Sequence, residues 1–144
     1  MIRKYTKSDD NEIIKTWYEA SVVAHSFIPE DFWASEKENI RKKYLPIAET
    51  YVAEKNGRVV GFISLIDNLI GALFVLPLYQ RKGIGSALVE TVKTLRKELF
   101  VEVYKDNVNA QQFYSNCGFS FVKEKIQSET GYTLLEMKIE TTYP

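Results

Sequence analysis

Cysteine and histidine are almost absent from this sequence, which contains one of each in 144 residues, Cys117 and His25. A single cysteine excludes a disulfide within the chain. Long apolar runs are lacking too, since no stretch approaches the roughly 18 residues of a membrane-spanning helix. The first residues, Met1-Ile2-Arg3-Lys4, lack the apolar core of a signal peptide. These features predict a protein of the reducing cytoplasm.

An excess of charge of either sign is also missing. Nineteen basic and nineteen acidic side chains cancel. A neutral chain has no long-range attraction to nucleic acid or to an anionic membrane, so we expect neither as a partner. The length, without any repeat or linker, predicts one domain over residues 1–144, as a monomer or a homodimer, with a well-buried core.

Helix and strand signals follow one another in a definite order. Strands are predicted at 2–5, 51–54, 59–65, 69–75, 99–103, 119–127 and 132–139, and helices at about 8–24, 30–44, 86–93 and 107–116. Asn56-Gly57 is a strong hairpin signal, and the apolar run 69–75 is typical of a strand buried on both faces. The order predicts an α+β fold: a twisted, mixed, mostly antiparallel sheet with one central parallel βαβ crossover and helices on both faces.

The loop that follows the strand 69–75 combines glycine with positive charge. Gly83 and Gly85 have no Cβ, so a phosphate can approach the backbone closely. The free N–H groups and the dipole of the next helix favour negative charge, and Arg81 and Lys82 add two cations. The loop lacks the Lys-Ser or Lys-Thr of a Walker A sequence and the third small residue of a dinucleotide fingerprint. It therefore predicts a phosphate site of another kind.

The residues around this loop resemble the pyrophosphate-binding motif of the GCN5-related N-acetyltransferase family, whose members bind acetyl-CoA. The matching positions are Val75, Pro77, Gln80, Gly83 and Gly85. One helix and one strand downstream, Asn107 to Phe119 is similar to the N-x-x-A-x-x-x-Y-x-x-x-G-F signature of the same family. The resemblance implies the acyl-CoA N-acyltransferase fold and direct transfer of an acetyl group from acetyl-CoA to an amine in a ternary complex.

The resemblance also implies which residues hold acetyl-CoA. They are Phe74, Val75, Gln80, Arg81, Lys82, Gly83, Ile84, Gly85, Ser86, Asn107, Asn109 and Tyr114. In the family, the strand before the loop and the strand after the next helix diverge, and the pantetheine pairs with the freed backbone groups. We expect the N–H of Phe74 or Val75 beside the thioester carbonyl as an oxyanion donor. For Asn107 and Asn109 we expect helix capping plus one side-chain contact with CoA.

Tyr114 aligns with the tyrosine that protonates the leaving thiolate in many family members. A phenol with an ordinary pKa of about 10 is neutral at physiological pH, so its proton is available. The neighbouring Phe113 and Phe119 give the alternative interpretation, a tyrosine of the core.

The group that accepts the proton of the amine is harder to identify. Many family members place a glutamate on the strand before the loop, but 69–75 contains no ionisable residue. His25 follows the first helix, and in this fold that connection walls the acceptor pocket, so His25 is our candidate for a catalytic base, directly or through water. The alternatives are a structural His25 and a water path to Asp67, Glu102 or a backbone carbonyl.

Aromatic residues crowd the same segment. We expect Phe27, Phe32 and Trp33 to line the acceptor pocket with His25, unless they pack as helix core; such a pocket favours an acceptor with an apolar portion. The expected acceptor is a primary amine of a small molecule or a peptide, and no metal is expected. Acetylation of a protein N-terminus or lysine, and a non-catalytic acyl-CoA binding or sensing module, are the alternative functions.

Overall fold

The computed structural model describes residues 1–143, which form one seven-stranded sheet with helices on both faces. The strands are β1 (Ile2–Lys4), β2 (Glu49–Lys55), β3 (Arg58–Ile66), β4 (Leu69–Val75), β5 (Glu98–Tyr104), β6 (Ser120–Ile126) and β7 (Thr133–Glu140). The helices are α1 (Asp10–Ala24), α2 (Glu30–Asn39), α3 (Ile84–Lys93) and α4 (Val108–Asn116), with short helical turns η1 (Lys7–Asp9), η2 (Ile40–Tyr44) and η3 (Pro77–Tyr79). Among these residues, no helix is long and apolar enough to cross a membrane.

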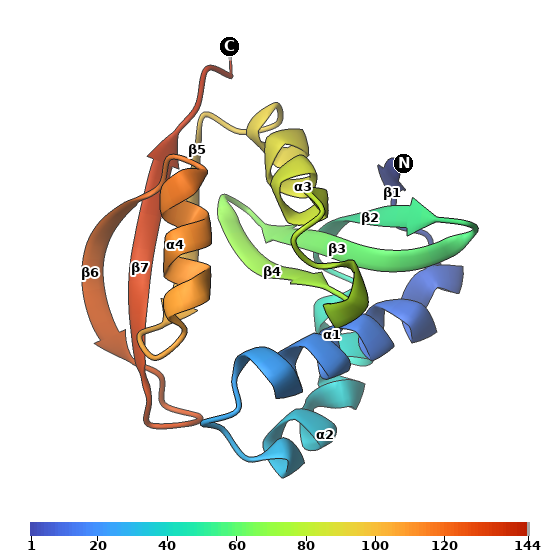
Figure 1. Cartoon of the computed structure of the whole chain (residues 1–144), viewed down its shortest axis with the longest axis horizontal. Helices are drawn as coiled ribbons and strands as arrows, with labels where there is room; N and C mark the ends of the chain where they lie inside the picture. Colours follow the sequence, from blue (N-terminus) through green and yellow to red (C-terminus); the bar gives the residue numbers. More distant parts are fainter. Residues whose placement is uncertain (144) are drawn as a thin grey trace.

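The strand order is β1-β2-β3-β4-β5-β7-β6, and β4 with β5 is the parallel pair in an otherwise antiparallel sheet. The β2–β3 hairpin turns at Asn56 and Gly57, with φ of 53° and 77°, the left-handed pair that its sequence favours. In Figure 1, β1 to β4 run across the view while β5, β6 and β7 run along its height. The predicted α+β fold with a central parallel crossover is confirmed.

β4 and β5 separate soon after they meet. Over the described residues their pairing is limited to Leu69 with Phe100 and Ile70 with Val101. From Gly71 onward β4 stays paired with β3 alone, while β5 pairs with β7. The expectation that 69–75 is buried on both faces was therefore wrong for residues 71–74: Gly71 is exposed and residues 72–74 are partly exposed, because the strand has lost one neighbour. Val75 is buried as expected. The sheet splits at this point.

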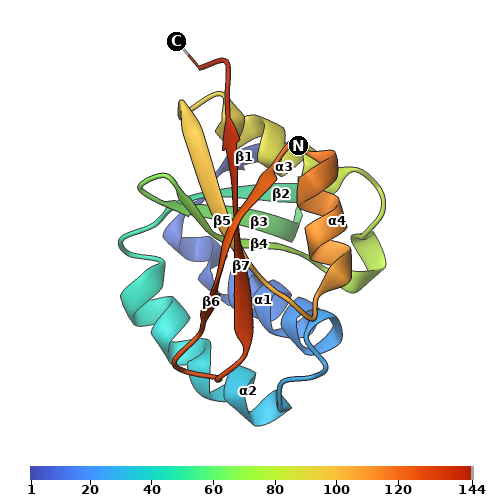
Figure 2. The same ribbon diagram turned by 90° about the vertical axis from the view of Figure 1, so that its left-hand side faces the viewer.

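Two apolar clusters lie on opposite faces of the sheet. The first contains Leu88 and Val92 of α3 and Tyr114 of α4, packed on strand residues such as Val101. The second contains Trp17 of α1 and Trp33 of α2, packed on residues such as Phe62 and Tyr104. Figure 2 shows the two helix pairs in different places, with α1 and α2 in blue and cyan below and α3 and α4 in yellow and orange at the upper right.

The helix expected over 30–44 changes its geometry near its end. α2 stops at Asn39, and η2 continues as a wider π-helical turn in which Leu45 N donates to Ile40 O at 2.9 Å. Such a turn shifts the side chains of its last residues around the helix axis. It brings Tyr44 over β4, where the sheet splits.

Candidate active site

The loop between β4 and α3 turns sharply before the helix begins. Arg81 and Gly83 both have left-handed backbone conformations, with φ of 62° and 83°. Gly83 is the N-cap of α3, and a Cβ built there would meet no atom of residues 1–143 within 4 Å. A side chain would strain the backbone and occupy the approach to the helix end, so glycine keeps this space open for a ligand.

Gly85 serves a different purpose from Gly83. A Cβ at Gly85 would lie 3.3 Å from the Phe113 ring of α4 and 4.0 Å from Val75 of β4. Its missing side chain therefore lets α3 pack closely against both elements. Gly83 thus leaves the helix end accessible, and Gly85 allows the helix to lie close to β4 and α4.

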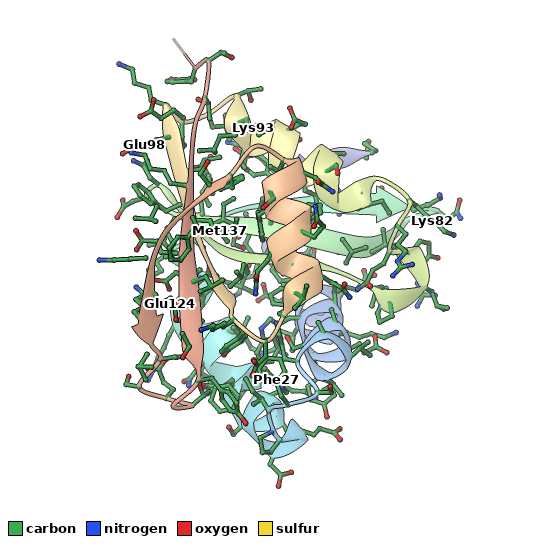
Figure 3. The ribbon with its side chains drawn as sticks, turned by 60° about the vertical axis from the view of Figure 1, so that its left-hand side comes forward. Phe27, Lys82, Lys93, Glu98, Glu124 and Met137 are labelled. Atoms are coloured by element: carbon green, nitrogen blue, oxygen red, sulfur yellow. The ribbon has the colours of Figure 1, made fainter. Side chains whose placement is uncertain are left out.

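The end of α3 suits an anion. The N-cap position, being glycine, gives the first N–H groups of the helix no side-chain acceptor within the described chain. Arg81, Lys82 and Ser86 are exposed around these groups. Figure 3 shows Lys82 at the outer edge of the molecule, on the loop before α3. Cationic side chains, free N–H donors and the positive end of the helix dipole together fit a pyrophosphate.

Gln80, expected to contact CoA, uses its side chain within the protein. Its Nε2 donates to the backbone oxygen of Val75 at 2.9 Å. This bond ties the loop back to the last residue of β4. The Gln80 side chain thus stabilises the junction between the strand and the loop.

Hydrogen-bond alternation decides which amides of β4 face the split. Leu76 N donates to Val60 O of β3 at 2.8 Å, so this opposed pair is hydrogen-bonded. In an antiparallel ladder, successive N–H groups point alternately toward the paired strand and away from it. The N–H of Phe74, two residues before Leu76, therefore also points to β3. The N–H groups of Val75 and Leu73 point the other way, toward the open edge. Of the two amides expected beside the thioester, only that of Val75 therefore faces the split, and Leu73 joins it. Counting back two residues from Val75 could have identified Leu73 from the sequence.

Tyr114 of α4 belongs to the apolar cluster on the α3 and α4 face of the sheet. Asn107 caps the helix as expected, accepting from Ala110 N at 3.1 Å, while Asn109 is exposed on the first turn. The Tyr114 ring lies 5.1 Å from that of Phe113 and 5.3 Å from that of Phe119, measured between centroids. Burial raises the pKa of Tyr114 well above its ordinary value. Tyr114 is therefore both a core residue and a neutral phenol that keeps its proton.

His25 joins the end of α1 to the start of α4. It is 8% exposed, and its Nε2 lies 3.0 Å from Asn107 Nδ2. Because Asn107 Oδ1 already accepts from Ala110 N, the Asn107 amide donates and His25 Nε2 accepts. The ring proton is then on Nδ1, which is buried with no hydrogen-bond partner among residues 1–143. Burial lowers the pKa of His25 to about 4.

The His25 ring is enclosed by aromatic residues. Its centroid lies 4.9 Å from that of Tyr104, 5.4 Å from that of Trp33 and 5.9 Å from that of Phe27. Tyr132 of the β6–β7 turn holds this group from the far side, donating to Phe27 O at 2.8 Å. Figure 3 shows Phe27 below α4, far from Lys82.

A cavity of about 390 Å³ opens beside this group, on the α1 and α2 face of the sheet. It is lined by Trp17, Phe32, Trp33, Glu36, Asn39, Ile40, Lys43, Tyr44, Tyr104, Gln127 and Glu129. Of the four residues expected to line the acceptor pocket, Phe32 and Trp33 line this cavity. His25 and Phe27 do not line it, and their rings pack against Tyr104, which does. Sequence reasoning missed Tyr44, Tyr104, Glu36 and Glu129, because nothing in their local pattern shows that the three distant segments meet.

The sequence model of the acetyltransferase (GNAT) domain matches residues 9–141. The chain belongs to the GNAT acetyltransferase family. It is 35% identical over 131 residues to the peptidyl-lysine N-acetyltransferase YiaC of Escherichia coli strain K12, a match that covers 90% of each chain. It is 28% identical over 139 residues to the peptidyl-lysine N-acetyltransferase YjaB of the same strain, covering 94% of each.

Solved structures share the fold of this GNAT member. The solution structure of apo YjaB from Escherichia coli has a TM-score of 0.84 at 24% identity, covering 100% of this chain and 98% of that one. PaiA N-acetyltransferase from Thermoplasma acidophilum, crystallised with coenzyme A, has a TM-score of 0.77 at 21% identity over 97% of this chain and 98% of that one. The expected fold is confirmed, and family membership confirms acetyltransferase activity with acetyl-CoA as the donor.

Proposed function

We propose that this acetyltransferase acetylates the side-chain amine of lysine in a peptide or protein. The observation that carries the proposal is the aromatic cavity on the α1 and α2 face, with carboxylates from two separate elements in its wall. The names of YiaC and YjaB, both peptidyl-lysine N-acetyltransferases, support the same acceptor. We also propose a cytoplasmic location for this acetyl-CoA-dependent enzyme.

The cavity suits the two parts of a lysine side chain. Its aromatic walls, such as Trp17 and Phe32, offer apolar surface for the four-carbon stem. Glu36 of α2 and Glu129 of the β6–β7 turn outnumber the single cation of the lining, Lys43, so the wall carries a net negative charge that attracts the ammonium group. Aromatic faces also attract a cation directly. A small amine without a stem would use only part of this surface.

On the opposite side of the split, we propose that the α3 end holds the pyrophosphate and the open edge of β4 holds the pantetheine. When bound, acetyl-CoA supplies the acetyl group as a thioester. The N–H of Val75 or Leu73 is oriented toward the open edge and can donate to a carbonyl oxygen there. We propose that Tyr114 gives its hydroxyl proton to the departing thiolate. Burial raises the pKa of Tyr114, which keeps the hydroxyl protonated but also makes it a weaker acid.

We assign His25 a positioning role in place of the base role considered from the sequence. A base works best when its pKa lies near the working pH, and burial holds the pKa of His25 at about 4. Its Nε2 is also engaged by Asn107. His25 instead fixes the end of α1 against the N-cap of α4. The amine proton then leaves through water.

The experiment compares three peptides incubated with the protein and acetyl-CoA, analysed by mass spectrometry. One has a blocked N-terminus and one lysine, the second has norleucine in place of that lysine, and the third has a free N-terminus without lysine. The proposal expects one added acetyl group on the first peptide only. Acetylation confined to the third peptide, or to small amines in a parallel panel, would contradict it. Binding of acetyl-CoA without transfer to any amine would favour the non-catalytic module.

A further inference from the structure

Tyr44 has a buried hydroxyl with an unusual position. The hydroxyl oxygen has no hydrogen-bond partner in the described part of the chain. It lies directly over Gly71, since a Cβ built on that glycine would be 1.9 Å from the Tyr44 oxygen. Buried hydroxyl groups are usually paired, and one left unpaired reduces stability. The fold thus holds a free hydroxyl against β4 at a position where only glycine fits.

This position is the point at which the sheet splits. Ile70 is the last residue of β4 that pairs with β5, and Gly71 is the next. Leu73 and Val75, whose N–H groups face the open edge, follow two and four residues later. Two residues of strand span about 7 Å. A donor extended along Val75 and Leu73 therefore brings its acyl end toward Gly71 and the Tyr44 hydroxyl.

Tyr44 also belongs to the wall of the acceptor cavity, beside Trp33 and Tyr104. Trp33 Nε1 is a second buried polar atom in this wall without a hydrogen-bond partner among residues 1–143. Tyr104, in contrast, donates to Gln127 Oε1 at 2.6 Å. Tyr44 thus lines the cavity, while its hydroxyl oxygen is buried at the vertex of the split and has no hydrogen-bond partner within residues 1–143.

We infer that Tyr44 binds the acceptor amine, its hydroxyl oxygen accepting a hydrogen bond from the nitrogen that attacks the acyl group. A phenol oxygen has lone pairs for this bond and keeps its own O–H as a donor. Burial raises the pKa of Tyr44 to about 12, so the group stays neutral and acts by orientation, without removing a proton. The inference rests on the proposed function, because it concerns the amine that the cavity receives.

The test is Tyr44→Phe, which removes the hydroxyl and keeps the ring. The variant should raise the KM for the blocked lysine peptide about 10-fold, the value of one ordinary hydrogen bond. Calorimetric titration of the same peptide into the CoA complex should show a comparable loss of affinity. The affinity for acetyl-CoA should not change, the Tm should stay the same or rise, and the shape of the pH profile of kcat/KM should be retained.

Tyr18→Phe is the matched control. The Tyr18 hydroxyl bonds Glu30 at the protein surface, so its removal should leave the peptide KM unchanged. A Tyr44→Phe enzyme with wild-type KM and wild-type peptide affinity would overturn the inference. So would a variant whose acetyl-CoA affinity and Tm fall together with its activity, because that pattern indicates a structural role. If the wild type acetylates another amine and no lysine peptide, the proposed function fails, and the same comparison on that amine decides the role of Tyr44.

Discussion

The two sides of the split differ in how they are built. The side proposed for the pyrophosphate, the phosphate side, is one short run, residues 75–86, and it offers backbone N–H groups, left-handed φ angles and a helix end. The side proposed for the amine, the acceptor side, draws on α1, α2, η2, β5 and the β6–β7 turn, and it offers side chains. The first side is exposed and polar, whereas the second is aromatic, with buried polar atoms that lack partners among residues 1–143.

This difference separates the constraints on donor and acceptor. A diphosphate requires N–H groups and a particular backbone path, and few residue types can supply that path. The acceptor wall requires shape and charge, which side chains such as Glu36 or Phe32 can change without moving the backbone. We infer that acceptor preference can change while the donor side stays the same. If the two sides are independent, a change on one side leaves the other side intact.

The largest effect is expected from the double substitution Gly83→Val and Gly85→Val. At Gly83 a side chain strains a φ of 83° and blocks the helix end, and at Gly85 it meets the Phe113 ring. Acetyl-CoA should raise the Tm of the wild type, because a ligand that binds only the folded state stabilises it, and this rise should be abolished in the variant. Thermal melts with and without acetyl-CoA, with circular dichroism as a check of folding, measure the effect.

Gly57→Val provides the control for backbone strain. Gly57 also has a left-handed φ, 77°, and open space around it, but it lies in the β2–β3 hairpin. This variant should lose stability while retaining the full rise in Tm with acetyl-CoA. If the double variant still bound CoA with wild-type affinity, the phosphate site would have to lie elsewhere.

A smaller but still large effect is expected from Tyr114→Phe. In the proposed mechanism the hydroxyl serves the departing thiolate and not the binding of acetyl-CoA, so kcat should fall by about 100- to 10,000-fold while the affinity for acetyl-CoA stays almost unchanged. Because the ring remains between Phe113 and Phe119, the fold should be retained. The measurement is kcat under conditions where chemistry limits the rate. An unchanged kcat there would remove Tyr114 from the mechanism and leave it as a core residue.

The smallest effect concerns His25, which joins the end of α1 to the N-cap of α4. Its pKa is about 4 in the folded protein and about 6.5 when unfolded, so the unfolded state binds the proton more readily. The stability from keeping His25 neutral is complete above pH 6.5 and is lost as the pH falls toward 4, by about 3 kcal/mol. Unfolding in denaturant from pH 7 to pH 4 should show this slope, and His25→Gln should reduce it. Equal slopes in the two proteins would mean that His25 is not held neutral by burial.

Much of this protein follows from local sequence. Asn56-Gly57 predicts its hairpin, Asn107 caps α4 as expected, and Gly83 has the left-handed backbone that glycine favours, at the site proposed for the pyrophosphate. Of the two β4 amides expected beside the thioester, that of Val75 faces the open edge but that of Phe74 points to β3. The direction of an N–H group depends on the pairing with β3 and not on residue type. The exposure of β4 beyond Ile70 was missed for a related reason, since an apolar run does not reveal where a neighbouring strand departs.

The sequence by itself determined the order of the elements and the family, and it located the proposed phosphate side, because backbone requirements are expressed by a few residues that are close together in the chain. Only the tertiary structure decided the neutral, enclosed state of His25 and the meeting of Tyr44, Tyr104 and Glu129 around one cavity. The physical reason is that burial, pKa and hydrogen-bond partners depend on neighbours brought together by folding. Tyr44 shows this most clearly, because its hydroxyl lies over Gly71, 27 residues away in sequence, and no local pattern predicts that contact.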